Sequence, residues 1–266
     1  MTAYIPYCGS PPVPGELMGA WNLDPWLLAG LGAAMLGYGL GAARARDVGA
    51  LRAGAFAVGW LLVAACLVSP LCNLTVALFS ARVAQHMLLT LVAAPLVVLG
   101  RPERAFAALL GGVRIGRLPG LAWVGPAAFA VLLWFWHLPV PYDATLRSDG
   151  AYWAMHLSLF GAALLLWRVL LPDGAAPALV AVGAGFLTSL QMGLLGAFLT
   201  LAGGAWYESH EATSWPWGLS PLADQQLGGL IMWVPGCAVF LVAGLAGVAS
   251  LLSRLERRGD PVQSRP

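Results

Sequence analysis

Four histidines are the side chains in this sequence best suited to chemistry, because the rest of the chain is largely apolar. His86, His137 and His156 lie in or at the end of three separate apolar stretches, and His210 lies in a more polar segment between two glutamates. Imidazole is the commonest metal ligand in proteins, and ionisable groups within a membrane usually mark function. A hydrogen bond between helices accounts for any one of them, but three in separate stretches favour a metal site.

Sulfur-bearing side chains accompany these histidines. Met87 follows His86 and Met155 precedes His156. Soft sulfur together with imidazole suits copper, and Cu(I) above all, better than magnesium, calcium or manganese. The further candidate ligands are Met192, Met232, Cys66, Cys72, His210 and, in the N-terminal tail, Cys8.

Two of the cysteines need not bind a metal. Cys66 and Cys72 are six positions apart at one end of an apolar stretch. A disulfide between them accounts for this spacing as well as copper does, and so does the packing of two small apolar side chains.

Polar side chains near the apolar stretches could orient the histidines. Gln85 precedes His86, and Asp224 with Gln225 opens a later apolar stretch. Ligand histidines commonly donate their second ring N–H to such a group, so Gln85, Asp224 and Gln225 are predicted to orient ligands. The alternative for Asp224 is a cap at the start of its own helix.

The composition indicates a membrane protein. Of 266 residues, 59% are apolar and 10% are charged, whereas a soluble domain has about 25% charged residues. The net charge of +2 leaves no basic surface that could neutralise the phosphates of a nucleic acid. The bilayer must therefore be the solvent for much of this surface.

Seven stretches are long enough to cross about 30 Å of hydrocarbon as helices. They predict an all-α, polytopic bundle of seven transmembrane helices, occupying residues 26–252, between an N-terminal tail (1–25) and a basic C-terminal tail (253–266). The seven predicted spans are residues 26–43, 53–69, 83–100, 118–137, 150–167, 178–202 and 225–252.

The arginines predict the orientation of these spans. Twelve of the fourteen fall on one side, and only Arg82 and Arg147 fall on the other. Because basic residues concentrate in cytoplasmic loops, we expect the N-terminus outside and the C-terminus inside. His86, His137 and His156 would then lie near the outer face, the first and last of them about 6 to 9 Å below the boundary.

Several short motifs occur in a characteristic order, namely Tyr7-Cys8-Gly9, His86-Met87, Trp136-His137-Leu138-Pro139, Asp224-Gln225 and Met232-Trp233-Val234-Pro235-Gly236. Together they resemble the CtaG family of cytochrome c oxidase assembly factors, the multi-span kind associated with caa-type oxidases. The resemblance implies a multi-pass protein of the bacterial plasma membrane that serves the maturation of a haem-copper oxidase and handles its copper. The residues carried over from the family are His86, Met87, His137, His156, Asp224, Gln225 and Met232.

We therefore predict a non-enzymatic assembly factor that holds copper near the outer face of the membrane through His86, His137 and His156, with a methionine or cysteine completing the site. Its expected partners are the lipid bilayer and a cytochrome c oxidase subunit, which receives the copper. The alternative is a membrane haem protein, or a haem-linked oxidoreductase, with the same histidines as axial ligands. Whether it forms a homo-oligomer is left open.

Overall fold

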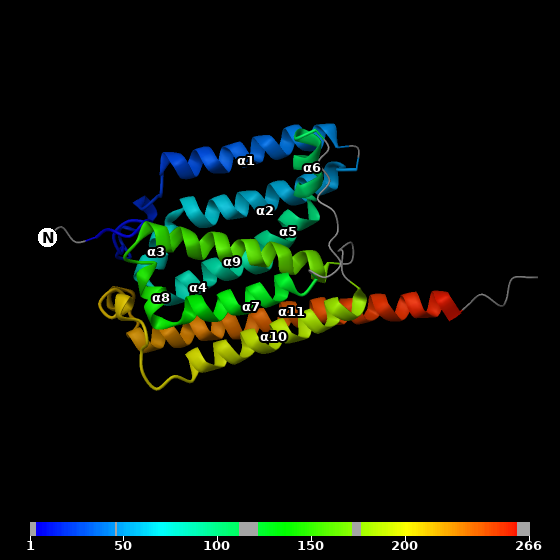
Figure 1. The fold of residues 1–266 in the computed structure, drawn as a ribbon. Coiled ribbons are helices and arrows are strands. Elements are labelled where there is room, and N and C mark those ends of the chain that lie inside the picture. Colours follow the sequence, from blue (N-terminus) through cyan, green and yellow to red (C-terminus); the bar gives the residue numbers. More distant parts are fainter. Residues whose placement is uncertain (1–3, 46, 112–121, 172–176, 260–266) are drawn as a thin grey trace, which may run out of the picture.

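A computed structural model gives the fold and describes residues 4–45, 47–111, 122–171 and 177–259. These residues form a helical bundle and contain no strand. In Figure 1 the long helices run side by side along one axis, and the chain passes back and forth between the two ends of the bundle. The prediction of an all-α bundle is therefore confirmed.

Six helices are long and apolar enough to cross a membrane. The fourth predicted span, 118–137, corresponds to the shorter α7 (Val124–His137), and residues 112–121 lie outside the described residues. A seventh span therefore stays a prediction. The six long helices are α1 (Pro25–Arg44), α2 (Ala50–Val68), the composite helix Phe79–Leu99, α9 (Asp149–Leu170), α10 (Ala178–Thr200) and α11 (Pro221–Gly259).

Local sequence explains where several helices begin. Asp24 accepts a hydrogen bond from the backbone N–H of Leu27 (2.8 Å), and Pro25 occupies the first turn of α1, a position that suits its fixed φ angle. Ser148 caps α9 in the same way through the N–H of Ala151. The end of the last helix differs from the prediction: α11 continues to Gly259, seven residues past the predicted end of the last span at 252.

The composite third helix changes its winding midway. It consists of α4 (Phe79–Met87), the π-helical turn η2 (Leu88–Ala93) and α5 (Ala94–Leu99). Pro95, in the first turn of α5, has no N–H to donate, so the hydrogen-bond ladder of this composite helix is interrupted next to the π turn. The carbonyl of Thr90 accepts a hydrogen bond from the indole of Trp167 on α9 at 2.7 Å. A neighbouring helix thus satisfies a backbone group in the altered turn.

The two ends of the bundle differ in composition. One end is here called the disulfide end, because the disulfide between Cys8 and Cys72 lies there. It contains residues 4–24, α3 (Pro70–Ala77), α8 (Pro139–Ala144) and the segment 201–220. The opposite end, here called the arginine end, contains α6 (Pro102–Leu109) and the described arginines Arg44, Arg52, Arg101, Arg104 and Arg168. The predicted separation of the arginines onto one side is therefore visible in the described part of the bundle.

Arg82 is the arginine whose surroundings differ most from expectation. It lies within α4 near the disulfide end and is 1% exposed, rather than in a loop. Its guanidinium donates a hydrogen bond to the hydroxyl of Thr145 and lies 5.3 Å from the centre of the Tyr142 ring. A cation–π contact and a hydroxyl partner thus help to accommodate this buried charge.

Candidate functional site

A small cavity in the bundle brings together several of the predicted ligands. Its volume is about 10 Å³, close to the minimum that holds one water molecule. Its apolar walls include Phe129, Leu133 and Leu159. The potential metal ligands that line it are His86 and Met87 from α4, His137 from α7, Met192 from α10 and Met232 from α11.

Gly236 on α11 leaves room for two of the methionines. A Cβ atom at this position would lie 2.8 Å from the Cε of Met192 and 3.1 Å from the Cε of Met87. Both methyl groups therefore approach the same point on α11. Substituting a larger residue here would displace the ends of these two side chains.

His86 has an unpaired nitrogen next to a second histidine. Its Nε2 atom is buried and has no hydrogen-bond partner among the described residues. Its ring centre lies 5.1 Å from that of His156 on α9. Because buried polar atoms in native proteins are nearly always paired, the lone Nε2 of His86 is the atom in this cavity that most needs a further partner.

His156 is bonded differently, since both of its ring nitrogens face oxygen atoms. Its Nδ1 lies 3.0 Å from the carbonyl of Tyr152, and its Nε2 lies 3.3 Å from Oε1 of Gln85. The amide nitrogen of Gln85 in turn donates to the carbonyl of Cys66 at 2.6 Å. A neutral imidazole can donate to only one oxygen. Gln85 therefore contacts a histidine, but it faces the nitrogen that a metal would need.

His137 is the last residue of α7 and is fixed at two points. Its Nδ1 lies 2.7 Å from the carbonyl of Leu133, and its own carbonyl accepts a hydrogen bond from the hydroxyl of Tyr207 at 2.9 Å. The first contact places the proton on Nδ1, because a carbonyl can only accept. The lone pair of the neutral ring is then on Nε2.

The three histidines do not converge as one ligand set. Within the described residues no group of three or more His, Cys, Asp or Glu is arranged to hold a metal ion. His86 shares the cavity with His137, and its ring contacts that of His156 at a tilt of 57°, so it is the member common to both pairs. The nitrogen donors available to the cavity are therefore two, and the other soft donors there are methionines.

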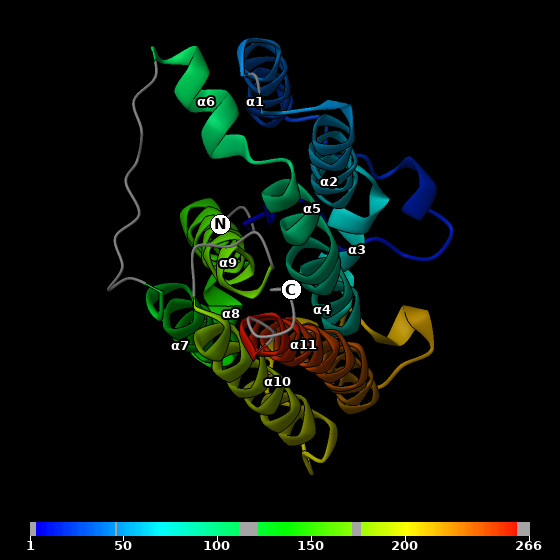
Figure 2. The ribbon, with the colours of Figure 1, turned by 90° about the vertical axis from the view of Figure 1, so that its right-hand side faces the viewer.

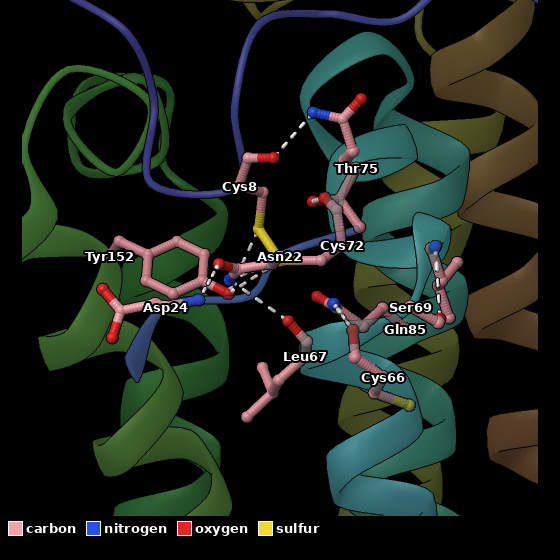
Figure 3. Close-up of a disulfide and its surroundings, with 12 residues drawn as sticks. Cys8, Asn22, Asp24, Cys66, Leu67, Ser69, Cys72, Thr75, Gln85 and Tyr152 are labelled. Carbon is pink, nitrogen blue, oxygen red and sulfur yellow. Dashed lines mark hydrogen bonds between the residues drawn. A yellow bond between two sulfur atoms is a disulfide. The ribbon is translucent and has the colours of Figure 1, made fainter. Parts of the chain in front are cut away.

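The disulfide joins a different pair of cysteines from Cys66 and Cys72. Cys8 of the N-terminal tail is bonded to Cys72 of α3, with their Cα atoms 5.4 Å apart (Figure 3). A disulfide between Cys66 and Cys72 is therefore wrong, and Cys66 is free and buried. Spacing along α2 and α3 could not reveal this pairing, because the tail folds back over α3. In this state neither Cys8 nor Cys72 offers a thiolate to a metal.

Tyr152 connects this disulfide with the histidines. Its hydroxyl lies 3.4 Å from the sulfur of Cys8 and 3.6 Å from the sulfur of Cys72 (Figure 3). Its ring centre lies 4.1 Å from that of His156, and Tyr7 stacks on its other side at 4.8 Å. The N-terminal tail thus packs directly against the residue that positions His156.

Asp224 caps a helix, but not its own. Its carboxylate accepts hydrogen bonds from the backbone N–H groups of Phe79 (2.6 Å) and Ser80 (3.1 Å), and from the Ser80 hydroxyl. Since α11 already begins at Pro221, Asp224 lies inside that helix and serves the N-terminus of α4. Asp224 therefore neither caps its own helix nor contacts a histidine; it caps the N-terminus of α4 instead.

The remaining predicted residues lie away from the cavity lining. Gln225 accepts a hydrogen bond from the N–H of Trp206 at 2.7 Å, and Met155 is buried in the core. His210 contacts the hydroxyl of Tyr142 at 2.7 Å and the carbonyl of Ala77 at 3.3 Å. Burial lowers the pKa of His210 to about 3. Gln225 and His210 thus tie the segment 201–220 to the bundle.

Two residues of the cavity have little to distinguish them in the sequence. Met192 is one of several methionines and has no neighbouring histidine along the chain, and Gly236 is only part of a motif. The sequence names Met192 only as one of several candidate ligands. The position of Met192 and Gly236 at the cavity follows from the packing of α10 against α11.

Comparison with known proteins identifies the family of this chain. A family model described as cytochrome c oxidase caa3 assembly factor (Caa3_CtaG) matches residues 36–254, a region that includes every residue lining the cavity. No curated protein and no solved structure matches the chain. Because the match covers most of the 266 residues, the chain belongs to the family of cytochrome c oxidase caa3 assembly factors.

Proposed function

We propose that this assembly factor binds Cu(I) as cargo in the histidine–methionine cavity and delivers it to a subunit of cytochrome c oxidase, without itself catalysing a reaction. The observation that supports the proposal is the convergence of two imidazoles and three thioethers from four helices on one small cavity. Thioether sulfur is a soft donor that suits Cu(I), and imidazole nitrogen also binds copper well. The cavity is also of a size that suits a single ion.

The nitrogen ligands are His86 and His137, through Nε2 in both cases. The Nε2 of His86 is buried without a partner among the described residues, so a bound ion would supply the missing interaction. His137 keeps its proton on Nδ1 through the contact with the Leu133 carbonyl, which leaves Nε2 unprotonated as ligation requires. Met87, Met192 and Met232 supply the sulfur.

His156 supports His86 rather than binding copper itself. Its two nitrogens face the Tyr152 carbonyl and the Gln85 amide oxygen, so binding a metal would cost it one of these contacts. Its ring packs against His86 and thereby restricts the orientation of the ligand. The three-histidine site expected from the sequence becomes, in this proposal, two ligands and one positioning residue.

The disulfide end faces the outside of a bacterial plasma membrane. Disulfides persist in oxidising compartments, and the Cys8–Cys72 bond lies at this end. The arginines gather at the opposite end, as cytoplasmic loops would. Copper would therefore enter and leave the protein near the segment 201–220. Tyr207 of this segment donates a hydrogen bond to the carbonyl of His137, the last residue of α7.

Copper is favoured over haem by the volume of the site. The cavity measures about 10 Å³, whereas sites for ligands of cofactor size measure about 300–1,000 Å³. A haem macrocycle would require the helices that carry His86 and His137 to separate. An optical spectrum of the purified protein checks this directly, because bound haem would give a Soret band.

A competition titration tests the copper proposal. Anaerobic Cu(I) is titrated into the purified protein against a chromogenic Cu(I) chelator, for the wild type, His86→Ala, Met192→Leu and, as a control, His210→Phe. We expect one Cu(I) per chain, at least tenfold weaker binding for the first two variants, and unchanged binding for the control, whose histidine is buried elsewhere. Wild-type affinity in His86→Ala would overturn the proposal.

Delivery needs a second measurement, in cells. A strain that carries only the His86→Ala variant should assemble an oxidase with reduced copper content, measured by elemental analysis of the purified enzyme. Full copper loading in this strain would contradict the delivery step, even if the isolated protein bound copper.

A further inference from the structure

Arg82 is a buried positive charge close to the histidine–methionine cavity. It lies on α4 beside Val83, which lines the cavity, and four residues before His86. Residues at this spacing are neighbours on one face of a helix, with Cβ atoms about 5–6 Å apart. Because side chains on a helix lean toward its N-terminus, the guanidinium lies on the disulfide side of His86, where it meets Tyr142 of α8. The charge therefore lies between the cavity and the disulfide end.

No carboxylate pairs directly with this charge. Its contacts are the hydroxyl of Thr145 and the ring of Tyr142, and its Nε atom has no hydrogen-bond partner among the described residues. The ion pairs in the same part of the chain involve other arginines. Arginine stays protonated in proteins, so Arg82 keeps its positive charge although it is 1% exposed.

Two buried carboxylates near the start of α4 are bound by backbone N–H groups instead. Asp224 accepts hydrogen bonds from Phe79 and Ser80, and Asp143 accepts one from Ser209 at 3.3 Å. They offset part of the positive charge from a distance, without contacting the guanidinium. Removing the guanidinium would therefore change the local charge by a full unit.

The charge of Arg82 affects a neighbouring histidine outside the spans. Burial is the main cause that lowers the pKa of His210 to about 3, and the positive charge of Arg82 is the second. His86 lies about one helical turn from Arg82 along α4. An ion bound at His86 would therefore experience a similar repulsion.

The surroundings of the cavity screen this repulsion poorly. Figure 2 shows the helices that line the cavity, α4, α7, α9, α10 and α11, grouped together in one part of the bundle. The cavity volume of about 10 Å³ leaves room for about one water molecule. Buried charges are screened much less by salt and water than exposed ones, so the charge of Arg82 extends into the cavity.

We propose that the buried charge of Arg82 makes the cavity select monovalent Cu(I) over divalent metal ions. This role rests on the proposed copper site and defines the charge of its cargo. The methionine donors favour soft ions, whereas a fixed positive charge distinguishes ions by their valence. At a separation of about 10 Å and an effective dielectric constant of about 20, the repulsion weakens binding of a monovalent ion about tenfold and of a divalent ion about 100-fold.

Arg82→Gln tests this role with two soft ions, Cu(I) and Cd(II), each titrated anaerobically against a chromogenic chelator. We expect the variant to bind Cu(I) about tenfold more tightly than the wild type, and Cd(II) about 100-fold more tightly. A residue with a purely structural role would give the opposite sign, because its loss would disturb the site and weaken binding. Unchanged or weaker Cu(I) binding would overturn the proposal, and so would a gain for Cd(II) no larger than that for Cu(I).

A matched pair of variants at Thr145 tests the same charge without removing Arg82. Thr145→Asp places a carboxylate opposite the guanidinium, whereas Thr145→Asn has nearly the same shape and no charge. Thr145→Asp should bind Cu(I) about tenfold more tightly than Thr145→Asn, because the new ion pair offsets the charge of Arg82. This pair decides the question if Arg82→Gln does not fold, and equal affinities would then overturn the proposal.

Arg147→Gln is the control for loss of a positive charge at the disulfide end. Arg147 is exposed and pairs with Glu208, so water screens its charge and the Cu(I) affinity should match that of the wild type. A gain equal to that of Arg82→Gln would contradict the proposal. Weaker Cu(I) binding by His86→Ala with unchanged binding by Arg82→Gln would refute the role of Arg82 alone, whereas no Cu(I) binding by the wild type would refute the copper site as well.

Discussion

The rings of His86 and His156 lie with their centres 5.1 Å apart, yet only His156 has an oxygen opposite each ring nitrogen. The buried Nε2 of His86 has no partner among the described residues. Two histidines on neighbouring helices therefore have unequal capacity to bind a metal. This difference distinguishes a ligand from the residue that positions it.

Replacing each of these histidines by phenylalanine should separate the two roles. His86→Phe removes the unpaired Nε2 and should weaken Cu(I) binding by at least tenfold. His156→Phe keeps an aromatic ring against His86 and should weaken binding by less than that. The measurement is Cu(I) affinity by chelator competition. An equal loss in both variants would instead indicate that His156 is a direct ligand.

The disulfide should contribute strongly to stability. Cys8 and Cys72 are 64 positions apart, and loss of a disulfide that closes a long loop costs about 2–5 kcal/mol. Cys8→Ser should therefore lower the melting temperature in detergent. Cys66→Ser serves as the control, because Cys66 is free and its variant keeps the disulfide.

Reductant provides the complementary test of this pairing. Treatment with a small thiol should lower the melting temperature of the wild type and of Cys66→Ser, and should leave that of Cys8→Ser unchanged. Sensitivity of Cys8→Ser to the thiol would show that a different cysteine pair forms the stabilising bond.

Asp224 should stabilise the start of α4 from its position on α11. Asp224→Asn replaces the carboxylate, which accepts two hydrogen bonds from backbone N–H groups and one from a hydroxyl. Hydrogen bonds to a charged acceptor contribute about 1.5–3 kcal/mol, so we expect a loss of stability of about that size. Chemical unfolding of the variant checks this, with Glu211→Gln, an exposed carboxylate in the segment 201–220, as the matched control.

The sequence is sufficient for features that depend on local composition. Apolar length locates the six long helices, and the arginines divide into two groups at opposite ends of the bundle. A π turn immediately precedes the helix that contains Pro95, whose missing N–H interrupts the local hydrogen-bond ladder. Each of these features depends on neighbours along the chain, so a single sequence contains the necessary information.

Features that depend on distant packing could not be predicted in the same way. Cys72 pairs with Cys8 because the tail folds over α3, where Asn73 also donates to the carbonyl of Cys8 at 2.6 Å. Asp224 lies 145 positions from the N–H of Phe79 that it binds. Met192 reaches the cavity only through the packing of α10 on α11. Such contacts follow from helix positions, which hydropathy does not determine.

His210 should make the protein less stable in acid. Burial lowers its pKa from 6.5 to about 3, so between these values the unfolded chain binds a proton that the folded protein does not. Stability must then fall as the pH falls through this window, while above pH 6.5 the group has no effect. Between about pH 7 and pH 5 the contribution of His210 to this loss is about 2 kcal/mol.

Unfolding of the wild type and of His210→Gln at about pH 7 and pH 5 measures this contribution. Glutamine can still hydrogen-bond near Tyr142 but does not titrate, so the variant should lose about 2 kcal/mol less than the wild type over this interval. The comparison cancels the effects of the other three histidines, because both proteins contain them. Parallel pH dependence in the two proteins would mean that His210 is protonated in the folded state as readily as in the unfolded chain, and that the segment 201–220 does not shield it.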